Sequence, residues 1–197
     1  MAGVVMAPLA ARLSRAGWRC HLFHYASRSR PLEANAEHLA RYAERRVGAR
    51  PAHYVGHSLG GLVVLRMLEA HRSLAVGAAV LLGTPARGSL AARHFQERRF
   101  GRWMLGASLP QWEEGRGAAW TRPEPLGVVA GSVPFGLARA WVRLPGSNDG
   151  VVRLEETAVA GMRQRIVLPV AHSEMIVSRR VADEVRAFLE RGCYSAA

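Results

Sequence analysis

The chain has 197 residues, of which 49% are hydrophobic and 21% are charged. That length supports one sizeable core and is short for two independent domains, so we expect a single domain over residues 1–197. A formal net charge of +12 raises nucleic acid or an anionic membrane as a partner class. All 27 basic residues are Arg, however, and they are scattered along the chain. We therefore predict a solvated basic surface and no nucleic-acid partner.

The sequence also argues against membrane insertion and export. No apolar run reaches the roughly 18 to 20 residues that a bilayer-spanning helix needs. Arg12 and Arg15 interrupt the first stretch, where a signal peptide keeps its apolar segment uncharged. Cys20 and Cys193 lie near opposite ends without metal-type spacing, which favours a reduced cytoplasmic protein with no metal.

Short apolar runs alternate with amphipathic stretches along the chain. In chain order the pattern predicts a helix over 8–17, a strand over 18–25, a helix over 32–46, a strand over 52–56, a buried helix over 60–71, strands over 76–82, 126–130 and 165–170, and a last helix over 179–191. Strands that alternate with helices imply a mostly parallel sheet covered by helices on both faces, an α/β class of fold.

One segment breaks this alternation. Residues 86–124 are rich in Gly, Arg and Trp, and they form a longer connection than compact domains usually have. We expect an inserted cap or lid within the single domain. The alternative, which the sequence leaves open, is a surface loop that packs three tryptophans onto the core: Trp103, Trp112 and Trp120.

A candidate nucleophile lies at Ser58. The run Gly56-His57-Ser58-Leu59-Gly60 matches the G-x-S-x-G pattern, in which a sharp strand-to-helix turn exposes the serine hydroxyl. The predicted strand before it and the buried helix after it supply the required setting. We expect a Cβ at Gly56 or Gly60 to press on the neighbouring strand or helix, and Gly61 to relieve the same crowding. The alternative is a serine in an ordinary tight turn.

A serine hydroxyl needs a base, and the base needs a carboxylate to orient it. In this arrangement the chain order is serine, acid, histidine. His172 is the one histidine beyond His94, and it lies between the last predicted strand and the last helix. Of the two aspartates, Asp183 falls inside that helix, which leaves Asp149 as the acid. The alternatives are a surface or capping histidine, and an Asn-Asp-Gly turn chosen for backbone shape alone.

These motifs together resemble a known family. Residues 56–61, the run Leu-Leu-Gly-Thr-Pro over 81–85 with Gly-Ser at 88–89, the run Asn-Asp-Gly-Val-Val over 148–152 and His-Ser at 172–173 are similar to the bacterial lipase and esterase branch of the α/β-hydrolase superfamily. The resemblance spans most of the chain. It implies hydrolysis of acyl esters through a serine acyl-enzyme, without a metal or organic cofactor. Leucines and tryptophans in 86–124 favour a small-molecule ester with an apolar acyl group as substrate.

The resemblance also implies what this chain lacks. In the family one oxyanion donor is the backbone N–H after the nucleophile, here that of Leu59, and the other belongs to a His-Gly loop after a central strand. Only residues 1–6 precede the first predicted helix, so we expect the N-terminal strand and that loop, and with them the second donor, to be missing. Either Met1 is an internal methionine of a longer reading frame, which we favour, or the chain is a real truncation. A missing central strand predicts marginal stability.

Several function classes therefore stay open. The leading one is a carboxylic-ester hydrolase. An acyltransferase would use the same serine, acid and histidine, and a catalytically impaired remnant of the fold could act as a binding protein. A nucleic-acid binder rests on charge alone. Acyl chain length and oligomeric state cannot be derived from the sequence.

Overall fold

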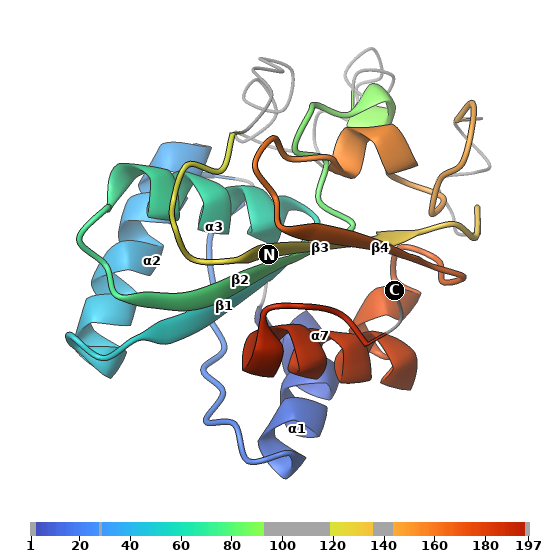
Figure 1. Ribbon diagram of the computed structural model, residues 1–197. Helices are drawn as coiled ribbons and strands as arrows, with labels where there is room; N and C mark the ends of the chain where they lie inside the picture. The colour runs from blue at the N-terminus through green and yellow to red at the C-terminus, as the bar shows by residue number, and fades with distance from the viewer. Residues whose placement is uncertain (1–2, 28, 93–118, 136–143, 196–197) are drawn as a thin grey trace.

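The computed structural model describes residues 3–27, 29–92, 119–135 and 144–195. Within these ranges the chain forms a four-stranded sheet in the order β1-β2-β3-β4, with every neighbouring pair parallel. The strands are β1 (Ala52–His57), β2 (Val76–Leu82), β3 (Leu126–Gly131) and β4 (Gln164–Leu168). Nearly every residue of β2 and β3 is buried, as expected for strands covered on both faces. The predicted α/β class is confirmed (Figure 1).

Helices cover the two faces of the sheet. On one face lie α2 (Leu32–Val47) and α3 (Leu59–Ala70), and on the other lie α1 (Ala7–Arg15) and α7 (Arg179–Arg191) (Figure 1). Each pair of helices packs its apolar residues against the sheet and forms a separate hydrophobic core. The short 3₁₀ helices are η1 (Gly3–Met6), η4 (Leu154–Thr157) and η5 (Glu174–Ile176).

The sequence pattern explains two of these helices in detail. Eight of the twelve residues of α3 are buried, because its apolar residues surround the helix almost completely. Helix α7 is amphipathic and buries one stripe, which includes Val181, Val185 and Phe188. Ser178 accepts a hydrogen bond from the Val181 N–H at its N-terminus, and Gly192 ends it in the left-handed conformation.

The strand predicted over 18–25 is wrong. Those residues have no regular secondary structure, and among the described residues no strand pairs with them. A β-strand exists only where its backbone groups pair with a neighbour, whereas here β1 pairs with β2 alone. The Tyr42 hydroxyl of α2 instead donates to the Leu22 carbonyl oxygen at 3.4 Å.

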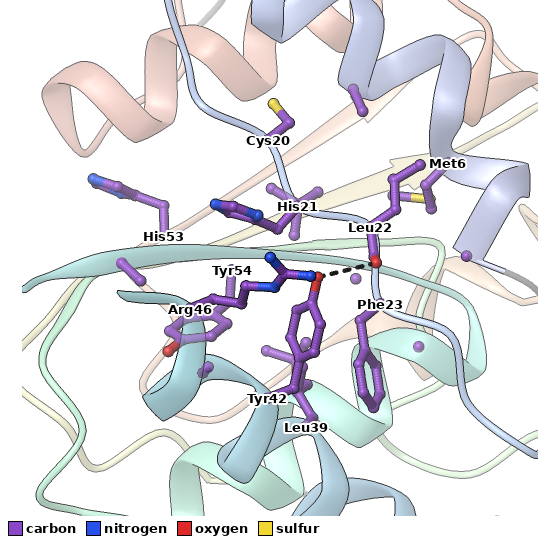
Figure 2. A pocket seen from close by; sticks show the side chains of 18 of the residues that line it. Met6, Cys20, His21, Leu22, Phe23, Leu39, Tyr42, Arg46, His53 and Tyr54 are labelled. Carbon is purple, nitrogen blue, oxygen red and sulfur yellow. Dashed lines mark hydrogen bonds between the residues drawn. The ribbon is translucent and has the colours of Figure 1, made fainter. Parts of the chain in front are cut away.

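A cavity separates this segment from β1. Its volume is about 510 Å³, and residues of α1, the 18–25 segment, α2 and β1 line it. Figure 2 shows Cys20, Leu22 and Phe23 on one side and His53 and Tyr54 on the other, with side chains of α2 reaching between them. The sheet edge at β1 therefore borders open space. This arrangement is compatible with a missing strand beside β1.

The predicted cap or lid at 86–124 falls largely outside the described residues, because 93–118 are not described. That prediction, and the positions of Trp103 and Trp112, stay untested. Trp120 is buried and packs with the core of α2 and α3, and its Nε1–H donates to the Glu124 carbonyl oxygen at 2.7 Å. In the part of the chain that the structure describes, no helix has both the length and the apolar character needed to cross a bilayer.

Candidate active site

Ser58 lies in a strained turn between β1 and α3. Its φ is 53° and its ψ is −126°, and among the described residues it is the only non-glycine residue with a positive φ. A side chain in this region costs conformational energy, so neighbouring contacts must hold the backbone there. The Ser58 N–H donates to the Leu82 carbonyl oxygen at 2.9 Å, and its own carbonyl oxygen accepts from Thr84 Oγ1 at 3.1 Å. The turn is thus tied to the end of β2.

Two of the three glycines around Ser58 are required by close packing. A Cβ at Gly56 would lie 2.5 Å from the Gly61 Cα, and a Cβ at Gly61 would overlap Thr84 Oγ1. The expectation for Gly60 is wrong. A Cβ there would lie 3.5 Å from the Tyr25 hydroxyl, an ordinary contact, because this position faces a side-chain tip rather than backbone.

Asp149 and His172 form a buried pair. The His172 Nδ1 lies 2.8 Å from Asp149 Oδ2, and the His172 N–H donates to the Asp149 carbonyl oxygen at 2.9 Å. The other carboxylate oxygen, Oδ1, accepts from the N–H groups of Val151 and Val152 at 2.9 and 2.7 Å. Since a carboxylate only accepts, Nδ1 carries the proton, and Nε2 is left as the basic nitrogen.

The loop that carries Asp149 owes its shape to its neighbours. Asn148 Oδ1 accepts from the Gly150 N–H at 3.0 Å, and Asn148 Nδ2 donates to the Gly146 carbonyl oxygen at 2.8 Å. Gly150 has a φ of 96°, and a Cβ there would overlap the Phe135 carbonyl oxygen. The Asn-Asp-Gly run therefore stabilises the backbone conformation of this turn, and that conformation directs the Asp149 carboxylate toward His172.

The three predicted residues all lie at the carboxyl end of the sheet. Ser58 follows β1, Asp149 lies beyond β3 and His172 follows β4. Gly83, directly after β2, lies beside the acid and the base, because a Cβ there would be 3.0 Å from both Asp149 Oδ2 and His172 Nδ1. Among the hydrogen bonds of the described residues, Asp149 and His172 are joined directly, and Ser58 Oγ has no bond to His172. Such contacts are often long before a substrate is bound.

Two residues of this region were missed by the sequence reasoning. His57 Nε2 lies 3.0 Å from the His172 carbonyl oxygen, and the two imidazole rings are 4.6 Å apart. Burial, together with the positive charge that His172 can carry, lowers the pKa of His57 to about 3. The one signal for His57 in the sequence is its position inside the serine motif. Residue spacing does not show which backbone group its side chain contacts.

The second missed residue is Glu156. Its buried carboxylate accepts from the N–H groups of Leu90 and Arg153 at 2.7 and 2.8 Å and pairs with Arg153 Nε at 3.1 Å. These bonds join the segment after β2 to the loop of Asp149. No spacing rule links Glu156 to the serine, so the sequence carried no signal for it.

The predicted oxyanion donor is the backbone N–H of Leu59, directly after Ser58. Leu59 is the first residue of α3, and its N–H has no partner within the helix. The described residues do not place a second donor. Within the same residues, no group of three or more His, Cys, Asp or Glu side chains could hold a metal ion.

Comparisons with known proteins agree with this fold. The chain has a TM-score of 0.74 with the mature lipase BlEst2 of Bacillus licheniformis, at 16% identity, covering 96% of this chain and 86% of that one. A thermophilic esterase from Thermogutta terrifontis gives 0.59 at 17% identity, covering 85% and 75%. The NocB thioesterase domain gives 0.54 at 17%, covering 95% and 89%.

These identities are low, so the likeness to the solved structures establishes the fold alone. A comparison with curated protein sequences found no match. The family model for the alpha/beta hydrolase fold matches residues 3–111, which is more than half of the chain. The chain therefore belongs to the α/β-hydrolase family.

Proposed function

We propose that this protein is a serine hydrolase that cleaves carboxylic esters through an acyl-enzyme on Ser58. The observation that carries the proposal is the buried pair of Asp149 and His172, 2.8 Å apart, at the sheet edge where Ser58 occupies a strained turn. The proposed steps use neither a metal nor an organic cofactor.

The chemistry follows from the geometry. His172 Nε2 takes the Ser58 hydroxyl proton as Oγ bonds to the acyl carbon, and Asp149 stabilises the imidazolium that forms. The oxyanion accepts a hydrogen bond from the Leu59 N–H. The tetrahedral intermediate then expels the alcohol, which takes the proton from His172. In the second half, water gives a proton to His172 as its oxygen bonds to the acyl carbon. The second tetrahedral intermediate then breaks the bond to Ser58 Oγ and releases the acid, and Ser58 takes the proton back from His172.

The proposed substrate is a small-molecule ester with an apolar acyl group. A lipase and an esterase are among the structurally similar proteins, which supports this substrate class. We place the protein in the cytoplasm, because Cys20 and Cys193 are both free thiols, as a reducing compartment would keep them.

A fluorophosphonate probe tests the nucleophile. It should label the wild-type protein and leave Ser58→Ala unlabelled, with kcat on a short-chain ester falling about 10⁶-fold. Ser173→Ala is the matched control, because Ser173 is an exposed serine next to His172 and should change neither readout. Labelling that persists in Ser58→Ala, or is absent from folded wild-type protein, overturns the proposal.

Two alternatives make different predictions. An acyltransferase would pass the acyl group to an added alcohol in preference to water, which the ratio of new ester to free acid measures. The second alternative is a non-catalytic binding protein. It is favoured because the described residues do not include a second oxyanion donor. It would bind an apolar ester without turnover and without probe labelling.

A further inference from the structure

His57 occupies a position between the proposed nucleophile and the proposed base. It is the last residue of β1 and directly precedes Ser58, and its side chain is partly buried. Its Nε2 lies 3.0 Å from the His172 carbonyl oxygen. A carbonyl oxygen only accepts, so Nε2 must carry the hydrogen of this bond.

The bond has a different role from the other bonds that hold His172. Both hydrogen bonds between His172 and Asp149 tie the base to the loop of the acid. Among the hydrogen bonds of the described residues, the bond from His57 is the one that ties the His172 loop to β1, the strand that leads into Ser58. Without it, the Asp149 and His172 pair could stay intact and still shift as a unit relative to Ser58.

The chemical state of His57 suits a permanent donor. Burial depresses the pKa of His57 to about 3, and the nearby His172 adds to the depression while Asp149 opposes it. The ring is therefore neutral at neutral pH, and the hydrogen on Nε2 stays available for the His172 carbonyl oxygen. Its ring also packs against the His172 ring at a centroid distance of 4.6 Å, so a bulky replacement would disturb both.

We propose that His57 is a positioning residue that fixes the distance between His172 and Ser58 by donating from Nε2 to the His172 carbonyl oxygen. This inference rests on the function proposed above. His57 does not touch the reacting atoms, and its effect is exerted through the placement of His172.

A pair of amide substitutions tests this role. The Nε2 atom of His57→Gln is as many bonds from the backbone as the imidazole Nε2, so it can keep the bond. The amide of His57→Asn ends near the position of Nδ1 and cannot reach. We expect His57→Gln to stay within about threefold of wild type, and His57→Asn to lose about 10- to 100-fold in kcat with KM nearly unchanged, because misplacement by about 1 Å can cost about 100-fold.

The experiment separates this inference from the proposed function. Fluorophosphonate labelling of wild type against Ser58→Ala tests the nucleophile first, and its failure overturns the proposed function. If that labelling succeeds but His57→Asn reacts as fast as His57→Gln, the positioning role is overturned and the proposed function stands. Thermal unfolding of both variants is the control, and His57→Phe is a second variant without a donor. Rates that follow thermal stability rather than the presence of a donor also overturn the inference.

Discussion

The carboxylate of Asp149 presents its two oxygens to different partners, one to backbone N–H groups and one to His172 Nδ1. Asp149→Asn should keep the first set of bonds through its amide oxygen. Its amide nitrogen would then face His172 and favour the tautomer with the proton on Nε2, which cannot act as the base. We expect kcat to fall about 10⁴-fold, measured on a short-chain ester. Asp183→Asn is the control, since Asp183 is exposed on α7, and an equal loss there would contradict the assignment.

His57 also gives the folded state a dependence on pH. Its pKa is about 3 in the folded protein, below the value of 6.5 for a free histidine, so the unfolded chain binds a proton more readily. The stability that follows from its neutral form is complete above about pH 6.5 and is lost as the pH falls toward about 3. Urea unfolding at several pH values should show this decline, and His57→Gln should make it shallower. An unchanged slope in the variant would contradict the shift.

Sequence reasoning could propose Ser58, Asp149 and His172 because the G-x-S-x-G run and the order of residues along the chain are both visible without coordinates. The structure brings Asp149 and His172 into a hydrogen bond. Sequence reasoning could not identify the partner of His57, which is a backbone carbonyl 115 residues away. Side-chain bonds to distant backbone leave no pattern in a single sequence.

At the scale of elements, the packing of β1 against α3 depends on Gly56 and Gly61. Gly61→Ala should destabilise the fold by about 1 to 3 kcal/mol, because its Cβ would overlap Thr84. Gly60→Ala is the matched variant, one residue away on the same helix, with room for a Cβ. It should be neutral or stabilise by up to about 1 kcal/mol, since Ala forms helix better than Gly.

Chemical unfolding measures both effects. Equal losses in the two variants would show that the contact with Thr84 is not the cause. Activity is left out of this comparison, because both positions adjoin the serine turn.

The helices and four of the five predicted strands could be read from apolar periodicity, with ends that differ from the structure by at most two residues. The strand over 18–25 could not. Trp18 and Cys20 pack against the core of α1 and α7, whereas Phe23 and Tyr25 pack against the core of α2 and α3. Burial on two sides produces a strand-like pattern even where no neighbour pairs with the backbone.

At the scale of the molecule, the cavity beside β1 is a departure from close packing within the part of the chain that the structure describes. Ala10 on α1 is partly buried and lines it, so Ala10→Leu would add apolar volume there. We expect a gain of about 0.5 to 2 kcal/mol in the free energy of unfolding, measured by urea titration. Ala11→Leu is the matched control, because Ala11 is exposed on the same helix. An equal gain in the free energy of unfolding of both variants would show that the cause is helix propensity and not filling of the cavity.

The fold class was predictable because alternating strands and helices pack in few ways. The size of the cavity was not, since it depends on how far the 18–25 segment settles from β1, and no pattern in the sequence sets that distance. The predicted marginal stability remains to be measured by the same urea titration of the wild-type protein.

The cavity has a practical consequence for work with the protein in solution. An apolar crevice of this size in the native state offers a site to amphiphilic dyes such as anilinonaphthalene sulfonate, whose fluorescence is normally taken to report loosened tertiary packing. The dye would then brighten with fully native protein. Partial unfolding should therefore be followed by near-ultraviolet circular dichroism instead.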